Sequence, residues 1–276
     1  MRIAYLMNGL FGGLTGKNMD RNHDEHVPIV AKYCKKSIDD FFCPNDTVDF
    51  FIFTWHSNHK NALQEIYQPK TLDCRDQATF SIPSCANNDK RSQSHVSRWF
   101  GYKQNFSNFE EFSAKEGINY DYVLNARLDI CWNRKIVVED LTKITLSSYT
   151  SHDDTGHPQN LRFDLNRWSS RMPTTYHQSD LADHVFGGNF DFMKKMTEIY
   201  DKIWYLHGEK RYSVTNPVMS HHRLIPGFIK ELGKKNEEVR YLFHYNHGGK
   251  RKVDYDIFRY RNLTVEKLKA ELECQT

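Results

Sequence analysis

Residues Val48–Trp55 form the segment that most restricts the fold of this chain. The stretch reads Val-Asp-Phe-Phe-Ile-Phe-Thr-Trp, and the turn-forming residues Pro44, Asn45 and Asp46 precede it. An almost wholly apolar run of this length, bounded by turn residues, indicates a strand that is covered on both faces. Such strands are typical of parallel sheets with helices on both sides, so the segment favours an α/β fold.

The order of the elements expected along the chain favours the same class. Strands are expected at Arg2–Met7, Val48–Trp55, within Lys70–Pro83 and from Tyr122, and helices at Val27–Phe42, Asn61–Tyr67 and Ser92–Gly117. This alternation predicts a mostly parallel central sheet flanked by helices. The second half predicts a long loop region at Ser147–Gln178, a strand or turn at Asp183–Gly188, helices from Phe190 and at Pro217–Leu232, a strand at Arg240–Tyr245 and a charged helix at Thr264–Leu272.

The composition is that of an ordinary globular protein. With 276 residues, of which 39% are apolar and 26% charged, we expect one domain with a smaller C-terminal half. The net charge of +3 predicts neither a nucleic-acid partner nor a membrane surface. No apolar run reaches the roughly 18 residues of a membrane span. Six cysteines without a Cys-x-x-Cys pair or regular spacing predict reduced thiols, and hence a cytoplasmic protein.

The segment Tyr120–Trp132 places two charges at the end of an apolar run. It reads Tyr-Asp-Tyr-Val-Leu-Asn-Ala-Arg-Leu-Asp-Ile-Cys-Trp, so Arg127 and Asp129 stand two residues apart where a buried strand ends. Charged side chains are almost never fully buried without partners. The pattern therefore predicts either a site for a polar ligand or an ion, or a mutual salt bridge.

Two other strands are also expected to end in polar or glycine-containing segments. The first strand runs into Asn8, Gly9, Leu10, Gly12 and Gly13, the second into Thr54, Trp55 and His56, and the third into Arg127 and Asp129. Ligands of parallel sheets sit beyond the carboxyl ends of the strands. We therefore expect these three segments to meet at one cleft.

Several segments together resemble one enzyme family. Tyr120–Asp129, preceded by a long helix, resembles the Tyr-Asp-x-Val-h-x-x-Arg-x-Asp pattern (h, apolar) of GT-A-like glycosyltransferases found in capsule gene clusters and large DNA viruses. Asp49–Trp55 is similar to the family's second strand, Asp183–Met193 to its later Asp-x-h-h-x-Gly segment, and Arg2–Gly9 to its first strand. The resemblance implies a GT-A-like fold, with a nucleotide-sugar-binding half at residues 1–135 and an acceptor half at 136–276. The chain departs from the family at Pro217-Val-Met-Ser, where the usual acidic residue is missing.

The resemblance implies transfer of a sugar from a nucleoside diphosphate sugar, with UDP ahead of GDP, to a hydroxyl of an oligosaccharide or glycoprotein acceptor. In such enzymes an Asp-x-Asp holds a metal diphosphate, and here Arg127 stands in place of the first carboxylate. Asp129 would then bind Mg²⁺ or Mn²⁺, with His247 or His244 completing the site, unless these histidines simply pack in a loop. Alternatively, Arg127 contacts phosphate directly, since a guanidinium matches phosphate in a fork.

Other residues are expected to hold the nucleotide sugar. The backbone at Asn8, Gly9 and Leu10 can approach a ligand closely. At the second strand end, Thr54 and Trp55 are candidates, and core packing is the alternative for Trp55. Two further sets would reach phosphates or else belong to a solvated surface: Arg98 and Lys103 on the long helix, and the basic run Lys250, Arg251 and Lys252.

For the proton acceptor, Asp183 is the first candidate and His184 the second. Asp183 stands where the chain enters an apolar segment, and burial would raise the pKa of its carboxyl toward a useful value. Helix capping is the alternative for this residue. An inverting reaction is favoured, because one positioned base suffices. Two other functions stay open: a degenerate nucleotide-sugar-binding or glycan-binding protein, and a glycoside hydrolase that uses Asp129 and Asp183 as its two carboxylates.

Overall fold

The computed structural model of the chain describes residues 1–11, 26–82, 90–137, 143–149, 181–208, 221–245, 255–257, 266–267 and 269–270. Its centre is a seven-stranded sheet in the order β3 (Thr71–Cys74), β2 (Thr47–Thr54), β1 (Arg2–Gly9), β4 (Tyr122–Arg127), β7 (Leu181–Gly188), β6 (Ile144–Tyr149) and β8 (Val239–Tyr245). Neighbouring strands are parallel except at β7, which is antiparallel to both β4 and β6. The predicted α/β class with a mostly parallel sheet is confirmed.

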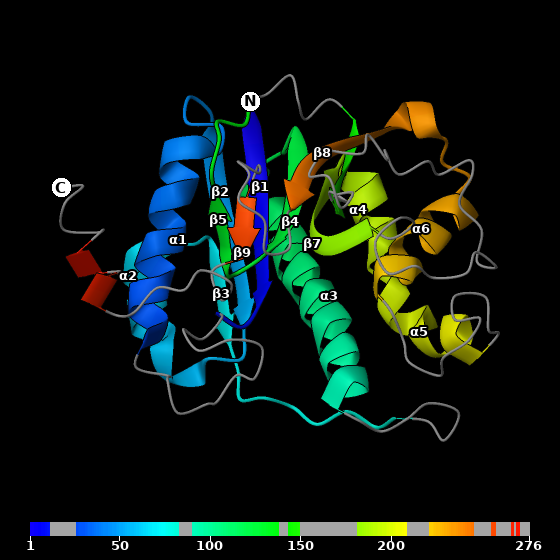
Figure 1. Ribbon diagram of the computed structural model, residues 1–276, viewed down its shortest axis with the longest axis horizontal. Helices are drawn as coiled ribbons and strands as arrows, with labels where there is room; N and C mark the ends of the chain where they lie inside the picture. The colour runs from blue at the N-terminus through cyan, green and yellow to red at the C-terminus, as the bar shows by residue number, and fades with distance from the viewer. Residues whose placement is uncertain are drawn as a thin grey trace, which may run out of the picture.

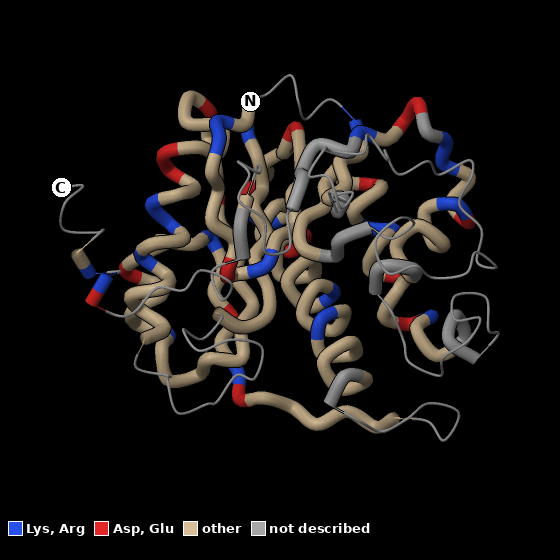
Figure 2. The backbone as a smooth tube through the Cα atoms, in the orientation of Figure 1, with Lys and Arg blue, Asp and Glu red and all other residues tan. Residues whose placement is uncertain are grey.

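Helices cover both faces of this sheet (Figure 1). One face packs against α1 (Val27–Phe41) and α2 (Lys60–Tyr67), together with a small antiparallel sheet of β5 (Ile130–Trp132) and β9 (Tyr255–Ile257). The other face packs against α3 (Lys90–Glu116), α4 (Phe190–Met196), α5 (Glu198–Gly208) and α6 (His221–Glu231). Because both faces are covered, the inner strands are mostly apolar. Figure 2 shows Lys, Arg, Asp and Glu along the helices that cover the sheet.

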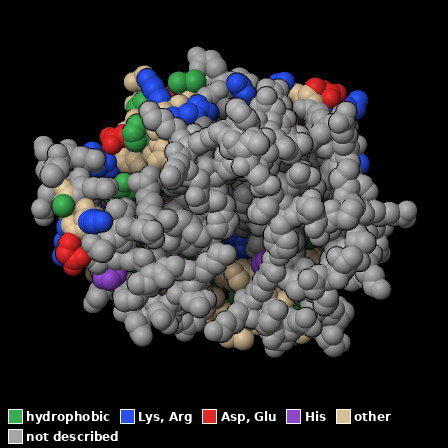
Figure 3. Space-filling model, viewed as in Figure 1, with side chains coloured by type: hydrophobic (Ala, Val, Ile, Leu, Met, Phe, Trp, Pro, Cys, Tyr) green, Lys and Arg blue, Asp and Glu red, His purple; other side chains and the backbone are tan. Residues whose placement is uncertain are grey.

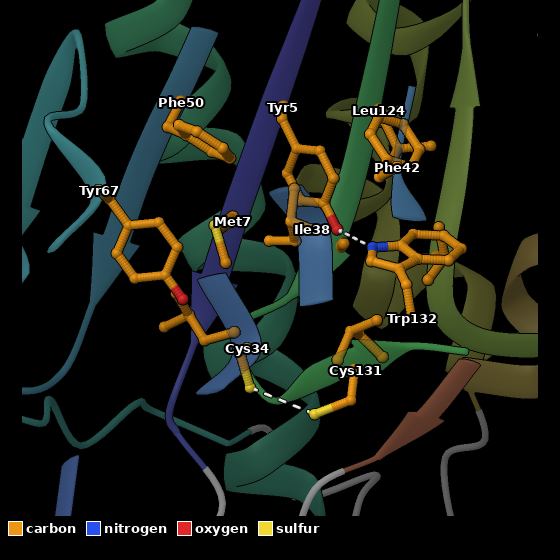
Figure 4. Close-up of a cluster of buried hydrophobic side chains, with 14 of the residues drawn as sticks. Tyr5, Met7, Cys34, Ile38, Phe42, Phe50, Tyr67, Leu124, Cys131 and Trp132 are labelled. Carbon is orange, nitrogen blue, oxygen red and sulfur yellow. Dashed lines mark hydrogen bonds between the residues drawn. The ribbon is translucent and has the colours of Figure 1, made fainter. Parts of the chain in front are cut away.

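Strand β5 is tied to the first face immediately after Asp129. The Trp132 indole N–H donates to the Tyr5 hydroxyl at 3.0 Å, and the sulfurs of Cys131 and Cys34 lie 3.6 Å apart (Figure 4). All four side chains are buried, and burial raises the pKa of the Tyr5 phenol. The short strand that follows the Arg127–Asp129 segment is therefore held against both β1 and α1.

Helix α3 approaches the opposite face of β1 and β2 closely. A Cβ added at Gly101 would lie 3.0 Å from the Phe53 ring, so only glycine allows this contact without adjustment. One turn later the Asn105 side chain, which is fully buried, donates to the main-chain oxygens of Met7 at 2.9 Å and Phe51 at 3.0 Å. These contacts fix α3 behind the carboxyl-terminal halves of both strands.

The second half of the chain differs from the sequence expectation in three places. Strand β6 extends into the segment that was expected to be a loop from Ser147. The alternation of apolar and polar residues in β6 is too weak to predict a strand, and pairing with β7 and β8 stabilises it. The helix expected from Phe190 divides into α4 and α5 at Thr197, whose hydroxyl donates to the Lys194 main-chain oxygen at 2.7 Å and so competes with the helical pattern. Strand β9 was not expected.

Among the described helices, none is both long and apolar enough to cross a membrane.

Candidate functional site

The order of the strands reverses between β1 and β4. From β1 the chain adds β2 and then β3 on one side, and α3 then carries it back to place β4 on the other side of β1. In open α/β sheets, ligands bind outside the carboxyl ends of the strands at such a reversal. The topology therefore points to the ends of β1 and β4 as the candidate site.

The three strand ends picked out in the sequence do lie side by side. In the parallel register, Asn8 of β1 faces Arg127 of β4 and Gly9 of β1 faces Thr54 of β2. The amino-terminal part of the antiparallel strand β7 reaches the same edge, because Val185 pairs with Ala126. Residues from four strands thus meet where the topology predicts a ligand.

Arg127 and Asp129 form a bidentate salt bridge. The Arg127 Nε and Nη2 atoms each lie 2.7 Å from a different oxygen of the Asp129 carboxylate. The Asp129 side chain is 0% exposed, whereas that of Arg127 is 21% exposed. The mutual salt bridge, one of the two alternatives expected from the sequence, is therefore present, and Arg127 is the member of the pair whose side chain reaches the surface.

This pairing bears on the expected metal site. Both Asp129 oxygens already accept hydrogen bonds from Arg127, and in the described part of the chain no group of three or more His, Cys, Asp or Glu residues could hold an ion. The described residues around Asp129 therefore do not fit Mg²⁺ or Mn²⁺. His247 lies outside the described residues, as do Lys250, Arg251 and Lys252, and for His244 the structure describes only the backbone, in β8.

A buried polar network lies beside this pair, on the face covered by α3. Arg98 Nη1 donates to the side-chain oxygen of Asn8, and Asn8 Nδ2 donates to the side-chain oxygen of Asn125. Asn8 and Asn125 are 1% and 0% exposed. Sequence reasoning did not single out Asn125, although an Asn inside an otherwise apolar strand was a usable signal. Of the two helix cations considered, Arg98 faces the sheet, while Lys103 faces solvent and pairs with Asp201 at 2.6 Å.

The end of β1 has a backbone conformation that glycine allows. Gly9 has a φ of +110°, a region that side chains disfavour, and no neighbour crowds it. Its carbonyl accepts from the Thr54 hydroxyl at 3.0 Å. Beyond the half-buried Leu10, the Phe11 N–H donates to His56 Nε2 at 3.1 Å. The segment after β1 is thus held by the end of β2, while Gly12 and Gly13 lie outside the described residues.

Trp55 is packed among aromatic side chains. The Phe100 ring stacks on it with ring centroids 5.8 Å apart. The Phe53 and Phe80 rings form T-shaped pairs with it, with centroids 4.9 and 6.2 Å from that of Trp55. The side chain is 7% exposed. Core packing, the alternative foreseen for this residue, is what the described contacts show, and stacking on a nucleotide base or a sugar stays a prediction.

Of the two candidate bases, only His184 has a described side chain. Its Nδ1 lies 3.1 Å from the hydroxyl of Tyr255 in β9, and it is 4% exposed. Which atom donates depends on the imidazole tautomer. For Asp183 the structure describes the backbone, within β7, but not the side chain, so its role as a base or a helix cap stays a prediction. Tyr255 had no signal in the sequence, because its contact joins segments 71 residues apart.

Figure 3 shows the face of the molecule seen in Figure 1, and a Lys or Arg side chain and a His side chain are visible near its middle. A hollow of about 460 Å³ lies at the amino-terminal end of β2, at the opposite end of the strands. Its charged residues all have partners: Lys35 pairs with Asp39, Asp49 with Lys70 and Arg2, and Asp46 with the amino terminus. We therefore place the functional site at the carboxyl ends of the strands instead.

Comparison of the sequence with models of known protein families, and with curated proteins, found no match.

Proposed function

We propose that the chain is a GT-A-like glycosyltransferase that moves a sugar from a nucleoside diphosphate sugar, with UDP as the first candidate, to a hydroxyl of a glycan acceptor. One observation carries the proposal. In a sheet whose core is mostly apolar, the Arg127–Asp129 pair, with its carboxylate fully buried, and the Arg98–Asn8–Asn125 network, with both amides buried, gather at the carboxyl ends of β1 and β4. This is where an open α/β sheet binds its ligand, and the sequence resemblance lies in the same segments.

On the donor side, the diphosphate gains negative charge as the sugar leaves and needs a fixed cation. Arg127 is held by Asp129 in one orientation, and its side chain is 21% exposed. A guanidinium remains charged at all working pH values and matches phosphate geometry. In this proposal Asp129 acts by orienting Arg127, and the backbone around Gly9 approaches the nucleotide.

On the acceptor side, a base takes the proton from the attacking hydroxyl. His184 lies at the same edge as Arg127 and contacts the Tyr255 hydroxyl through Nδ1. In the tautomer that carries its proton on Nδ1 and donates it to Tyr255, Nε2 is the basic nitrogen of the ring, and in this proposal it takes the hydroxyl proton. Asp183, the neighbouring residue in β7, is the alternative base, and a single base on one side of the sugar corresponds to an inverting reaction.

The first test is ligand binding. Thermal melting of the wild-type protein with UDP, GDP and the uncharged nucleoside uridine should show stabilisation by a nucleoside diphosphate, because a ligand that binds only the folded state raises its stability. Turnover of UDP-sugars with a glycan acceptor then separates an enzyme from a protein that only binds nucleotide sugars. Stabilisation by free oligosaccharides but by no nucleoside diphosphate would overturn the proposal in favour of a glycan-binding protein or a hydrolase.

The second test concerns the divalent ion. Because Arg127 supplies a permanent charge and the described residues offer no metal ligand set, we expect part of the activity to persist in EDTA. The assay compares initial rates in EDTA, Mg²⁺ and Mn²⁺. Complete loss of activity in EDTA with full recovery in Mn²⁺ would contradict this expectation and point to a metal site that includes residues such as His247.

A further inference from the structure

Arg98 reaches from α3 to the end of β1. Its Nη1 donates to the Asn8 side-chain oxygen and also lies 3.5 Å from the Asn8 main-chain oxygen. Asn8 in turn donates from Nδ2 to the Asn125 side chain in β4. We call this series of contacts the Arg98–Asn8–Asn125 relay, and it joins one helix to the two strands on either side of the reversal in strand order.

The charge of Arg98 decides how both amides are oriented. A guanidinium has donors but no acceptor, so Asn8 must turn its oxygen toward Arg98. Its NH₂ group then faces Asn125, which must turn its own oxygen toward Asn8. One cation on α3 therefore orients two buried amides and holds the residue that precedes Gly9.

This relay is a poor way to stabilise the contact between helix and sheet. Asn125 Nδ2 is fully buried and finds no hydrogen-bond acceptor among the residues that the structure describes, and a buried donor without an acceptor costs free energy. The neighbouring inward residues on this face, Leu6 and Val123, are apolar and 0% exposed. Stability alone would favour apolar residues here, and departures of this kind are expected at functional sites.

We propose that Arg98 is a positioning residue of the site, which acts through Asn8 to hold the end of β1 where the diphosphate of the donor binds. This inference rests on the proposed function. It separates Arg98 from Lys103, which lies further along the same helix and pairs with Asp201 in solvent.

The test compares Arg98→Met with the matched control Lys103→Met. Both changes remove one positive charge from α3, and melting temperature and circular dichroism establish that both variants are folded. Isothermal titration with UDP and with uridine then measures affinity. We expect Arg98→Met to weaken UDP by about tenfold or more, because small displacements in a site carry large effects. The affinity of Arg98→Met for uridine, and the affinity of the control Lys103→Met for UDP, should change less than about twofold. Arg98→Lys keeps the charge but not the forked guanidinium, so its affinity for UDP should lie between those of the wild type and Arg98→Met.

Comparing UDP with uridine separates positioning from general damage, since a merely structural loss would weaken both ligands alike. Equal UDP affinity in Arg98→Met and wild type, with UDP bound by the wild type, would overturn the inference and leave the proposed function standing. If the wild type binds neither UDP nor GDP, the proposed function fails and the role assigned to Arg98 in diphosphate binding fails with it.

The relay itself has a test that needs no ligand. Urea unfolding of the wild type, Arg98→Met, Asn125→Val and the double variant gives the coupling energy of the two changes. Arg98 and Asn125 are joined through Asn8, so we expect coupling that disappears when the four measurements are repeated in an Asn8→Ala background. Additive effects in the wild-type background would show that no relay exists.

Discussion

At the scale of single residues, Asp129 has two roles in this structure. Its carboxylate, which is 0% exposed, balances the charge of the partly exposed Arg127, and it fixes the direction of the guanidinium. Removing one partner of a buried pair leaves the other charge uncompensated, which is costly even where the intact pair adds little net stability. A change at Asp129 therefore tests both stability and the orientation of Arg127.

We predict that Asp129→Asn lowers the free energy of unfolding by about 2 kcal/mol or more, because one charged hydrogen bond is lost and Arg127 keeps an unbalanced charge. Urea unfolding measures this. The control is Asp39→Asn, which removes the partner of Lys35 on the surface of α1, where Asp39 is 54% exposed, and should cost about 0–1 kcal/mol. Equal, small effects of the two changes would contradict the burial of the Arg127–Asp129 pair.

A second prediction at this scale concerns Cys74, at the end of β3. Burial raises the pKa of its thiol from about 9 to about 11. Since the thiolate is the reactive form, only about 0.1% of Cys74 is reactive at pH 8, against about 10% for an ordinary thiol. We expect iodoacetamide to modify Cys74 about 100-fold more slowly in the folded protein than in urea, with the difference closing as the pH approaches 11. Peptide mass spectrometry over pH 7–10 checks this, and equal rates at pH 8 would contradict it.

At the scale of the elements, Gly187 allows the antiparallel strand β7 to lie between β4 and β6. The Tyr122 side chain of β4 passes over Gly187 of β7, and its hydroxyl lies 2.6 Å from the Thr145 hydroxyl of β6. A Cβ at Gly187 would stand 2.5 Å from the Tyr122 oxygen and 2.7 Å from its ring. The buried ring has little freedom to move, so the packing of β4, β7 and β6 against one another requires that residue 187 has no side chain.

We predict that Gly187→Ala destabilises the protein by about 1–3 kcal/mol through overpacking. Tyr122→Leu removes the ring and should also destabilise the protein. The double variant, however, should lose less free energy of unfolding than the sum of the losses in the two single variants. Urea unfolding of the four proteins gives this coupling. Strict additivity would mean that the Tyr122 ring does not cover Gly187.

At the scale of the whole molecule, protection of the sheet should fall from its centre to its edge. The six inner residues of β1 are buried, whereas all four residues of the edge strand β3 are only half-buried. Regions with more buried apolar contacts open at a higher free energy. We predict that hydrogen exchange followed by mass spectrometry finds the amides of β1 and β4 among the slowest and those of β3 clearly faster. Equal protection of β1 and β3 would contradict the strand order.

The sequence alone was enough for the architecture of the first half, where the signals are local. The apolar run at Val48–Trp55 predicted β2, because a strand buried on both faces is apolar at successive positions. The helical periodicity of Ser92–Gly117 predicted α3, because a helix buried along one side has apolar residues every three to four positions. It also located the ends of β1, β2 and β4 as the candidate site, since polar residues after apolar strands are a local signal too. Strand β6 was missed, because its support comes from neighbours distant in sequence.

Tertiary structure alone decided what the site residues do with one another. The sequence left Arg127 and Asp129 as either ligand contacts or a pair, and Arg98 as either a phosphate contact or a solvated residue. Packing made the first two a buried salt bridge and turned Arg98 toward Asn8 while Lys103 remained in solvent. The contact of His184 with Tyr255 likewise joins β7 to β9. Side-chain partners of this kind depend on distances between elements, and periodicity along one element carries no information about those distances.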